Sequence, residues 1–154
     1  MLVVGDGPEK KPLMGWAREL GISKQITFVD SVPHEDMPLY FAMCHVYVSA
    51  CTSDIMSSSV LEALCSGLAV VIRHDPANAR IVKEGINGFT YKTAKEFGGY
   101  LRQFASLDSE GRRLLRRVVR KSLHLLPPSQ QAKEYLLAYE QAKSLHYYSE
   151  ENQK

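Results

Sequence analysis

The 154-residue sequence lacks the features that mark several large classes of protein. No apolar run approaches the roughly 18 residues that a membrane-spanning helix needs. The first residues have neither the basic start nor the cleavage site of a secretory signal peptide. A net charge of +2 is too small to indicate a nucleic-acid partner. The composition therefore predicts an ordinary cytoplasmic domain, long enough to build a hydrophobic core.

Cysteine is also scarce. The three cysteines, Cys44, Cys51 and Cys65, are odd in number and lack the spacing of metal ligands. Neither a disulfide framework nor a metal site is therefore predicted. Reduced thiols in or near the core of a cytosolic protein are the simplest interpretation.

Strands alternate with helices at short spacing over the first ninety residues. Strands are predicted over 1–4, 25–29, 45–50, 68–73 and 88–91, and helices over 11–20, 39–44, 59–66 and 77–84. From residue 94 the pattern is helical, with two prolines at 127–128 between two long segments. This order predicts an α/β fold, a Rossmann-like parallel sheet with helices on both faces and additional C-terminal helices. One domain is predicted over residues 1–148, followed by a polar tail over 149–154.

The most informative stretch of the chain runs from Thr52 to Ile72. Asp54 precedes a serine-rich turn, Glu62 lies on the helix that this turn opens, and Gly67 ends that helix. Free N–H groups at a helix N-terminus favour anions, and carboxylates accept hydrogen bonds from hydroxyl groups. The pattern therefore predicts a site for an anion that carries hydroxyl groups, such as a sugar nucleotide.

The same residues have structural alternatives. Ser59 and Glu62 have the spacing of a capping box, in which Glu62 accepts a hydrogen bond from the Ser59 N–H. Asp54 could be an acidic turn residue. His74 and Asp75 follow a predicted strand at its carboxyl end, where open α/β sheets bind ligands, but a solvated loop would look the same.

Five segments of the chain share a family pattern. They are Gly5-Asp-Gly-Pro8, Ile26-Thr-Phe-Val29, Leu39–Ala42 with Val46–Ser49, Leu61-Glu-Ala-Leu-Cys-Ser-Gly67 and Gly85-Ile-Asn-Gly88. With these segments the chain resembles the C-terminal half of a GT-B fold glycosyltransferase, in the retaining, nucleotide-sugar-dependent family called glycosyl transferases group 1. The segment ending at Gly67 is the most specific, since it resembles the family signature Glu-Ala-Met-Ala-Ser-Gly.

The resemblance implies a role for each matching residue near the donor. Glu62 would accept hydrogen bonds from the ribose, and Asp54 would contact hydroxyl groups of the donor sugar, so these two carboxylates form the implied catalytic pair. The backbone N–H groups of Ser57, Ser58 and Ser59 would lie near the diphosphate.

The resemblance also implies the substrates. The backbone around Val29 and Asp30 would flank the base of the nucleotide. The donor is expected to be a UDP-sugar, and its hexose would pass to a glycan or lipid acceptor with retention at the anomeric carbon. No metal and no cofactor besides the donor is implied, because helix dipoles and basic side chains would stabilise the leaving diphosphate.

Several features depart from the family pattern. Asp54 is one methylene shorter than the family's glutamate, Ser57 replaces a glycine, and Arg80 stands where a glutamate is frequent. The family's diphosphate-binding arginine and lysine and its N-terminal domain have no counterpart here. The isolated half is therefore expected to be inactive, because catalysis needs a cleft closed between two domains. A non-catalytic partner or regulatory domain is the alternative; no site typical of a sugar-nucleotide epimerase, which shares the fold, is found.

A basic helical face is predicted between residues 112 and 121. Its members are Arg112, Arg113, Arg116, Arg117, Arg120 and Lys121. Such a face suits a peripheral contact with anionic lipid, but the solvated side of a packed helix has the same pattern.

Overall fold

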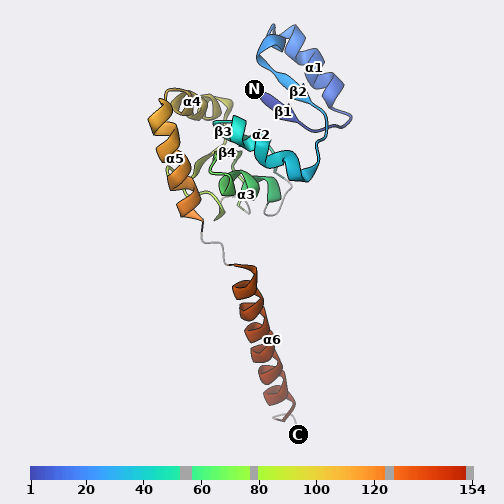
Figure 1. Ribbon diagram of the computed structural model, residues 1–154. Helices are drawn as coiled ribbons and strands as arrows, with labels where there is room; N and C mark the ends of the chain where they lie inside the picture. The colour runs from blue at the N-terminus through green and yellow to red at the C-terminus, as the bar shows by residue number, and fades with distance from the viewer. Residues whose placement is uncertain (53–56, 77–79, 124–126, 152–154) are drawn as a thin grey trace. The chain divides into compact units, whose positions relative to one another are not determined.

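The computed structural model describes residues 1–52, 57–76, 80–123 and 127–151, with side chains up to residue 143 (Figure 1). The chain separates into two compact units, Met1–Leu123 and His124–Lys154. The domain boundaries predicted from the sequence stay predictions, although helix α6, Pro128–Glu151, continues into the segment predicted as a polar tail.

The described strands of the first unit are all parallel. Strand β1 (Leu2–Val4) pairs with β2 (Thr27–Val29), and a second sheet has the order β3 (Val46–Ser49), β4 (Ala69–Arg73) and β5 (Gly88–Tyr91). Parallel neighbours need long crossover connections, and helices occupy most of these crossovers. The predicted α/β, Rossmann-like fold class is therefore confirmed.

The helices of the first unit lie close to the predicted positions. They are α1 (Lys10–Glu19), α2 (Met37–Met43), α3 (Ser58–Cys65), α4 (Ala94–Ala105) and α5 (Ser109–Ser122), with 3-10 turns at Ser23–Gln25 and His34–Asp36. The first long helical segment predicted after residue 94 is two helices, because Asp108 accepts a hydrogen bond from the Gly111 N–H at 2.7 Å and caps a new helix.

The helix predicted over 77–84 is wrong where the chain is described, from Arg80 onward. Residues 80–84 form turns and a single bridge between Glu84 and Gly88. The side chain of Asn87 organises this loop, since its Oδ1 accepts from the Lys83 N–H at 2.7 Å and its Nδ2 donates to the Ile81 carbonyl at 3.2 Å. These bonds replace the backbone bonds that a helix would have made.

The core lies around strand β4. All residues from Leu68 to Ile72 are buried, and the inner side of α3 covers them with Val60, Ala63 and Leu64. Val119 of α5 is fully buried in the same cluster. A central strand buried on both faces is continuously apolar, as its sequence predicts.

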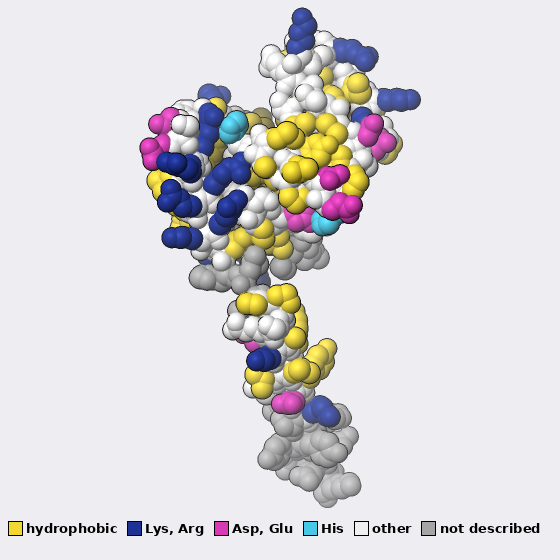
Figure 2. All heavy atoms as spheres, in the orientation of Figure 1, with side chains coloured by type: hydrophobic (Ala, Val, Ile, Leu, Met, Phe, Trp, Pro, Cys, Tyr) yellow, Lys and Arg dark blue, Asp and Glu magenta, His cyan; other side chains and the backbone are white. Residues whose placement is uncertain are grey.

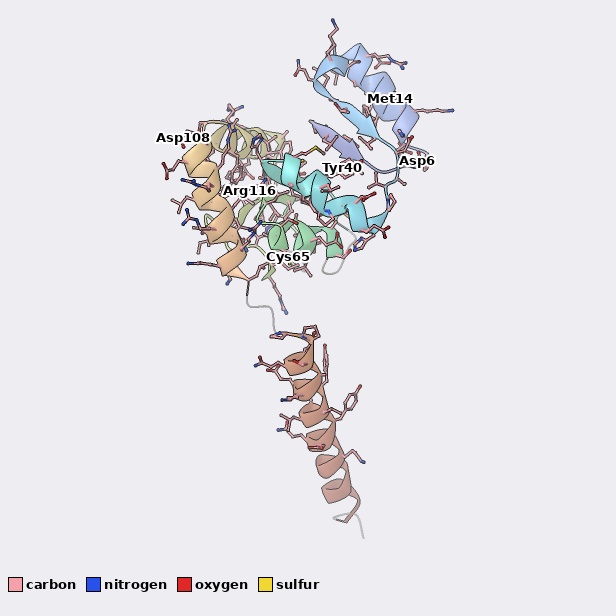
Figure 3. All side chains as sticks on the ribbon, in the orientation of Figure 1. Asp6, Met14, Tyr40, Cys65, Asp108 and Arg116 are labelled. Atoms are coloured by element: carbon pink, nitrogen blue, oxygen red, sulfur yellow. The ribbon has the colours of Figure 1, made fainter. Side chains whose placement is uncertain are left out.

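Arginines of α5 connect this helix to the carboxyl ends of two others. Arg116 donates to the carbonyl oxygens of Ala42 and Cys44, at 3.1 and 2.6 Å, where α2 ends (Figure 3). Arg120 donates to the Ser66 carbonyl at 3.1 Å, where α3 ends. Carbonyl groups at a helix end lack partners within the helix, so these guanidinium groups satisfy them and oppose the helix dipole.

The second unit contains helix α6. Its described side chains, up to residue 143, are all exposed, and they include Tyr135, Leu136, Leu137 and Tyr139. None of the helices described in either unit combines the length and apolar character that crossing a bilayer requires.

Candidate functional site

The N-terminus of α3 is the centre of the predicted site. The helix begins at Ser58, and Ser57 is its N-cap residue, with φ −52° and ψ 118°. Among the described residues, the Ser57 side chain makes no cap hydrogen bond to the first turn. Ser57 is buried, whereas Ser58 is exposed. The N-terminus of α3 therefore has the character of an anion site, because backbone N–H groups and the positive end of the helix dipole lie together there.

A chain of hydroxyl groups holds this turn in place. The Tyr47 hydroxyl donates to Ser59 Oγ at 2.9 Å, and Ser59 Oγ lies 2.9 Å from Ser57 Oγ. Tyr47 belongs to β3, so the chain ties the start of α3 to the neighbouring strand. Sequence reasoning missed Tyr47, whose only signal is a polar aromatic residue within an apolar strand.

Glu62 lies on the second turn of α3, half-buried, one helical turn after Ser58. The capping-box alternative for Glu62 is wrong, because Ser57 rather than Ser59 is the N-cap and Glu62 is therefore two positions beyond N3. The structure thus brings Ser57, Ser58, Ser59 and Glu62 together on the first two turns of one helix. The carboxylate of Glu62 is left without the structural role that its spacing suggested.

The other residues predicted to contact the sugar nucleotide do not lie on α3. Asp54 lies outside the described residues, and its role stays a prediction. Val29 ends β2, in the other sheet, and its carbonyl oxygen accepts from the Gly5 N–H at 3.1 Å. The Asp30 carboxylate forms an ion pair with Lys10 of α1, which raises the pKa of the Lys10 ammonium. Lys10 and its pairing with Asp30 were not found from the sequence.

A polar cluster lies beside the carboxyl ends of β4 and β5. Glu84 Oε1 accepts from both the N–H and the hydroxyl of Thr90, at 2.9 and 2.6 Å. His74 Nδ1 lies 3.4 Å from the Thr90 hydroxyl oxygen, and its backbone N–H donates to the Tyr91 carbonyl at 2.8 Å. His74 is exposed, so the structure places it at the predicted sheet edge, in contact with Thr90.

The cysteines differ in exposure. Cys44 and Cys51 are half-buried, and Cys65 on α3 is exposed, so the prediction that all three lie in or near the core is wrong for Cys65. Burial raises the pKa of the Cys44 thiol, against the opposing effect of the Arg116 charge. Among the described residues, no group of histidine, cysteine and acidic side chains has the arrangement of a metal site.

The chain is similar to known proteins in both sequence and fold. The family model described as Glycosyl transferases group 1 matches residues 1–121. The alpha-monoglucosyldiacylglycerol synthase of Acholeplasma laidlawii is 27% identical over 100 residues, which are 65% of this chain and 25% of that protein. The chain thus spans about a quarter of the length of this curated relative.

Solved structures share the fold. Sucrose-phosphate synthase from Thermosynechococcus elongatus superposes with a TM-score of 0.78 and 19% identity, over 94% of this chain and 38% of that one. HepE from Anabaena, solved in complex with UDP-glucose, has a TM-score of 0.68 and 20% identity, over 78% of this chain and 34% of that one. At these identities the similarity shows the fold, and the GT-B resemblance predicted from the sequence is confirmed.

Proposed function

Because the chain belongs to the glycosyl transferases group 1 family, we propose that it is the donor-binding part of a glycosyltransferase. The complete enzyme would move a hexose from a nucleotide sugar to a glycan or lipid, on the cytoplasmic side, without a metal and with retention at the anomeric carbon. The name of the Acholeplasma relative, a glucosyldiacylglycerol synthase, supports a lipid acceptor. The UDP-glucose bound by HepE supports a UDP-sugar donor.

One observation carries this proposal. In the described part of the chain, Ser57 does not cap the first turn of α3 with its side chain, and the half-buried carboxylate of Glu62 follows one turn later. The amide groups of Ser57, Ser58 and Ser59 suit the diphosphate, and the Glu62 carboxylate suits the ribose hydroxyls. A diphosphate and a ribose adjoin in a nucleoside-diphosphate sugar, so the two halves of the site fit one ligand of that class.

The same geometry suggests how the reaction would be assisted. Negative charge grows on the diphosphate as the bond to the sugar breaks, and a helix N-terminus stabilises charge that develops near it. The hydroxyl chain from Tyr47 to Ser59 and Ser57 fixes the turn, so little reorganisation is needed during the reaction. Asp54, three residues before Ser57, would meet the hydroxyls of the donor sugar.

A lipid acceptor would bring the enzyme to a membrane surface. The proposed function therefore favours peripheral membrane contact, one of the two interpretations that the sequence leaves open for the basic face of α5.

An amide NMR titration of the chain with UDP, GDP, ADP and UDP-glucose tests the donor site. We expect saturable shifts in the first turn of α3 with UDP and UDP-glucose, and their loss in Glu62→Ala. The matched control is Glu19→Ala, which removes an exposed carboxylate from α1 and should leave the titration unchanged. Equal binding in both variants, or no saturable shifts with any nucleotide, would contradict the proposal.

A second candidate is a non-catalytic partner or regulatory domain of the same fold. Exposed apolar side chains on α1 and at its C-cap favour it, since Trp16 is 59% exposed and the C-cap residue Leu20 is 71% exposed. With Leu13 and Phe28 they line an apolar groove of about 230 Å³ over α1, β1 and β2. Exposed apolar groups of this kind favour contact with further polypeptide. Tight association with another chain, together with absent nucleotide binding, would support this candidate over the first.

A further inference from the structure

Helix α5 concentrates positive charge. It carries five arginines, one lysine and a single acidic residue, Glu110, whereas the whole chain has a net charge of only +2. The rest of the chain is therefore net negative. Figure 2 shows the Lys and Arg side chains gathered over this helix.

The structure sorts these basic residues into two sets of three. Arg112, Arg116 and Arg120 contact the body of the first unit, since Arg112 Nη1 lies 3.1 Å from His45 Nε2 and the other two hold the ends of α2 and α3. Half of the predicted basic face is thus occupied by internal contacts.

The second set faces outward. Arg113, Arg117 and Lys121 are exposed and recur every four residues, so they form one stripe along the helix. Arg113 pairs with Glu110 at 3.2 Å on the surface, and a solvent-exposed pair of this kind contributes little to stability. This outward stripe is the part of the basic face that can meet a partner.

Exposed apolar side chains lie beside the outward stripe. Leu114 is 57% exposed and Val118 39%, one residue after Arg113 and Arg117. Both line an open, mostly apolar cavity of about 340 Å³ together with Ile86, which is 48% exposed. A helix surface that carries cations next to apolar side chains matches the boundary between lipid headgroups and acyl chains. A soluble polyanion would contact the cations but would gain nothing from the apolar side chains.

We propose that α5 docks on an anionic lipid bilayer. In this arrangement Arg113, Arg117 and Lys121 contact the headgroups, and Leu114 and Val118 enter the acyl boundary. The inference deepens the peripheral contact of the proposed function and rests on it. It is tested without nucleotide, so vesicle binding and donor binding succeed or fail separately.

Co-sedimentation of the 154-residue chain with vesicles tests the docking. Vesicles of phosphatidylcholine alone are compared with equal mixtures of phosphatidylcholine and phosphatidylglycerol. We expect binding to the mixed vesicles only, weakened by salt because screening shortens the range of the attraction. The triple variant R113E/R117E/K121E should bind at least roughly 100-fold more weakly, because each cation near an anionic surface contributes about fivefold.

The matched control reverses three exposed basic residues elsewhere in the first unit, in the variant K11E/R18E/K24E. Net charge changes equally in the two triple variants. General electrostatic attraction therefore predicts that both lose vesicle binding equally, whereas docking through α5 predicts that only R113E/R117E/K121E loses it. The double variant L114S/V118S should weaken binding several-fold and leave its salt dependence unchanged. Circular dichroism checks that each variant is folded.

Three outcomes would overturn the proposal. One is equal binding of the two triple variants to the mixed vesicles, and another is no preference for phosphatidylglycerol. The third is binding of an oligonucleotide, but not of vesicles, through the outward stripe, which would assign α5 to nucleic acid instead.

Discussion

Gly67 shows how one residue sets the exit from the helix that carries the proposed site. Its φ is +82°, in the left-handed region, and a Cβ placed there would lie 3.0 Å from the Arg116 carbonyl oxygen and 2.9 Å from Arg120 Nε. Gly67→Ala therefore combines backbone strain with a steric clash. We expect it to lower the free energy of unfolding by about 2–4 kcal/mol, measured by urea denaturation.

Gly99 provides the matched control. It lies within α4, its φ is not positive, and nothing lies within 4 Å of a Cβ placed there. Gly99→Ala should raise the free energy of unfolding by about 0.5–1 kcal/mol, because alanine loses less entropy in a helix. Similar losses in both variants would show that local strain at Gly67 is not the cause.

A second residue, Asn87, joins separate parts of the chain through its side chain. It is fully buried, and its side chain joins the loop before β5 to the Ser122 hydroxyl of α5 at 3.1 Å. Asn87→Ala leaves the Lys83 N–H without its acceptor, so we expect a loss of at least about 2 kcal/mol in the free energy of unfolding. A double-mutant cycle with Ser122→Ala should show coupling of more than about 0.5 kcal/mol, and strict additivity would argue against the bond.

At the scale of the element, α5 stabilises the helices that it contacts through its arginines. Arg116→Met removes two hydrogen bonds to carbonyl groups at the end of α2, one of them 2.6 Å long. A loss of about 1.5–3 kcal/mol in the free energy of unfolding is expected. Arg117→Met, which changes an exposed neighbour in the same helix, should stay within about 0.5 kcal/mol of the native chain. Equal effects of the two changes would contradict the role given to Arg116.

Helix α4 begins with a capping box that responds to pH. Thr93 Oγ1 accepts from the Glu96 N–H at 3.2 Å, and the Glu96 carboxylate accepts from the Lys92 N–H at 2.8 Å. The bond from Lys92 holds the pKa of Glu96 below its ordinary value of 4.5. A lowered carboxyl pKa in the folded state contributes stability above the unfolded pKa, and that stability is lost as the pH falls through the folded pKa.

The native chain and the Glu96→Gln variant should therefore differ in how their stability depends on pH in the acid range. The stability advantage of the native chain should be constant above about pH 5 and shrink as the pH falls below 4.5. Thermal unfolding midpoints across this range measure it. A constant difference at every pH would mean that the Glu96 charge does not contribute.

The same element scale shows where sequence patterns succeed and where they fail. Strands are predicted well because β-branched and apolar runs are local signals, and β3, β4 and β5 lie within one or two residues of their predicted bounds. The capping box at Ser59 was wrong and the one at Thr93 was not predicted, although both share the same spacing. Which serine or threonine becomes the N-cap depends on where the preceding loop meets the sheet. The four-residue capping-box motif does not contain that information.

Side-chain contacts between distant elements also could not be predicted from the sequence. The position of Glu62 on a helix at the carboxyl end of β3 follows from the pattern around it. The contacts of Arg116 with the end of α2, and of Tyr47 with Ser59, join residues that are far apart in the chain. Periodicity predicts that Arg116 is on the polar side of its helix but not that it faces a neighbouring helix end.

At the scale of the whole molecule, the division after Leu123 predicts that the first unit folds alone. The described side chains of α6 up to residue 143 are exposed, so little apolar burial depends on them. Removing residues 124–154 should therefore leave the unfolding midpoint of the remaining chain unchanged within about 2 °C. Calorimetry of the native and shortened chains measures this. A clear fall of the midpoint would show that the last helix contributes to the stability of the first unit.

The exposed thiol of Cys65 gives this molecule a natural place for a reporter. It lies on α3 (Figure 3). Glu62 comes three residues earlier in the same helix, and residues at this spacing are neighbours on a helix surface. Cys44 and Cys51 are half-buried, and the raised pKa of Cys44 lowers its share of reactive thiolate. A maleimide dye would therefore attach first at Cys65, without any engineered cysteine. Its emission should change if a ligand binds beside Glu62, so occupancy of the proposed donor site could be followed in real time.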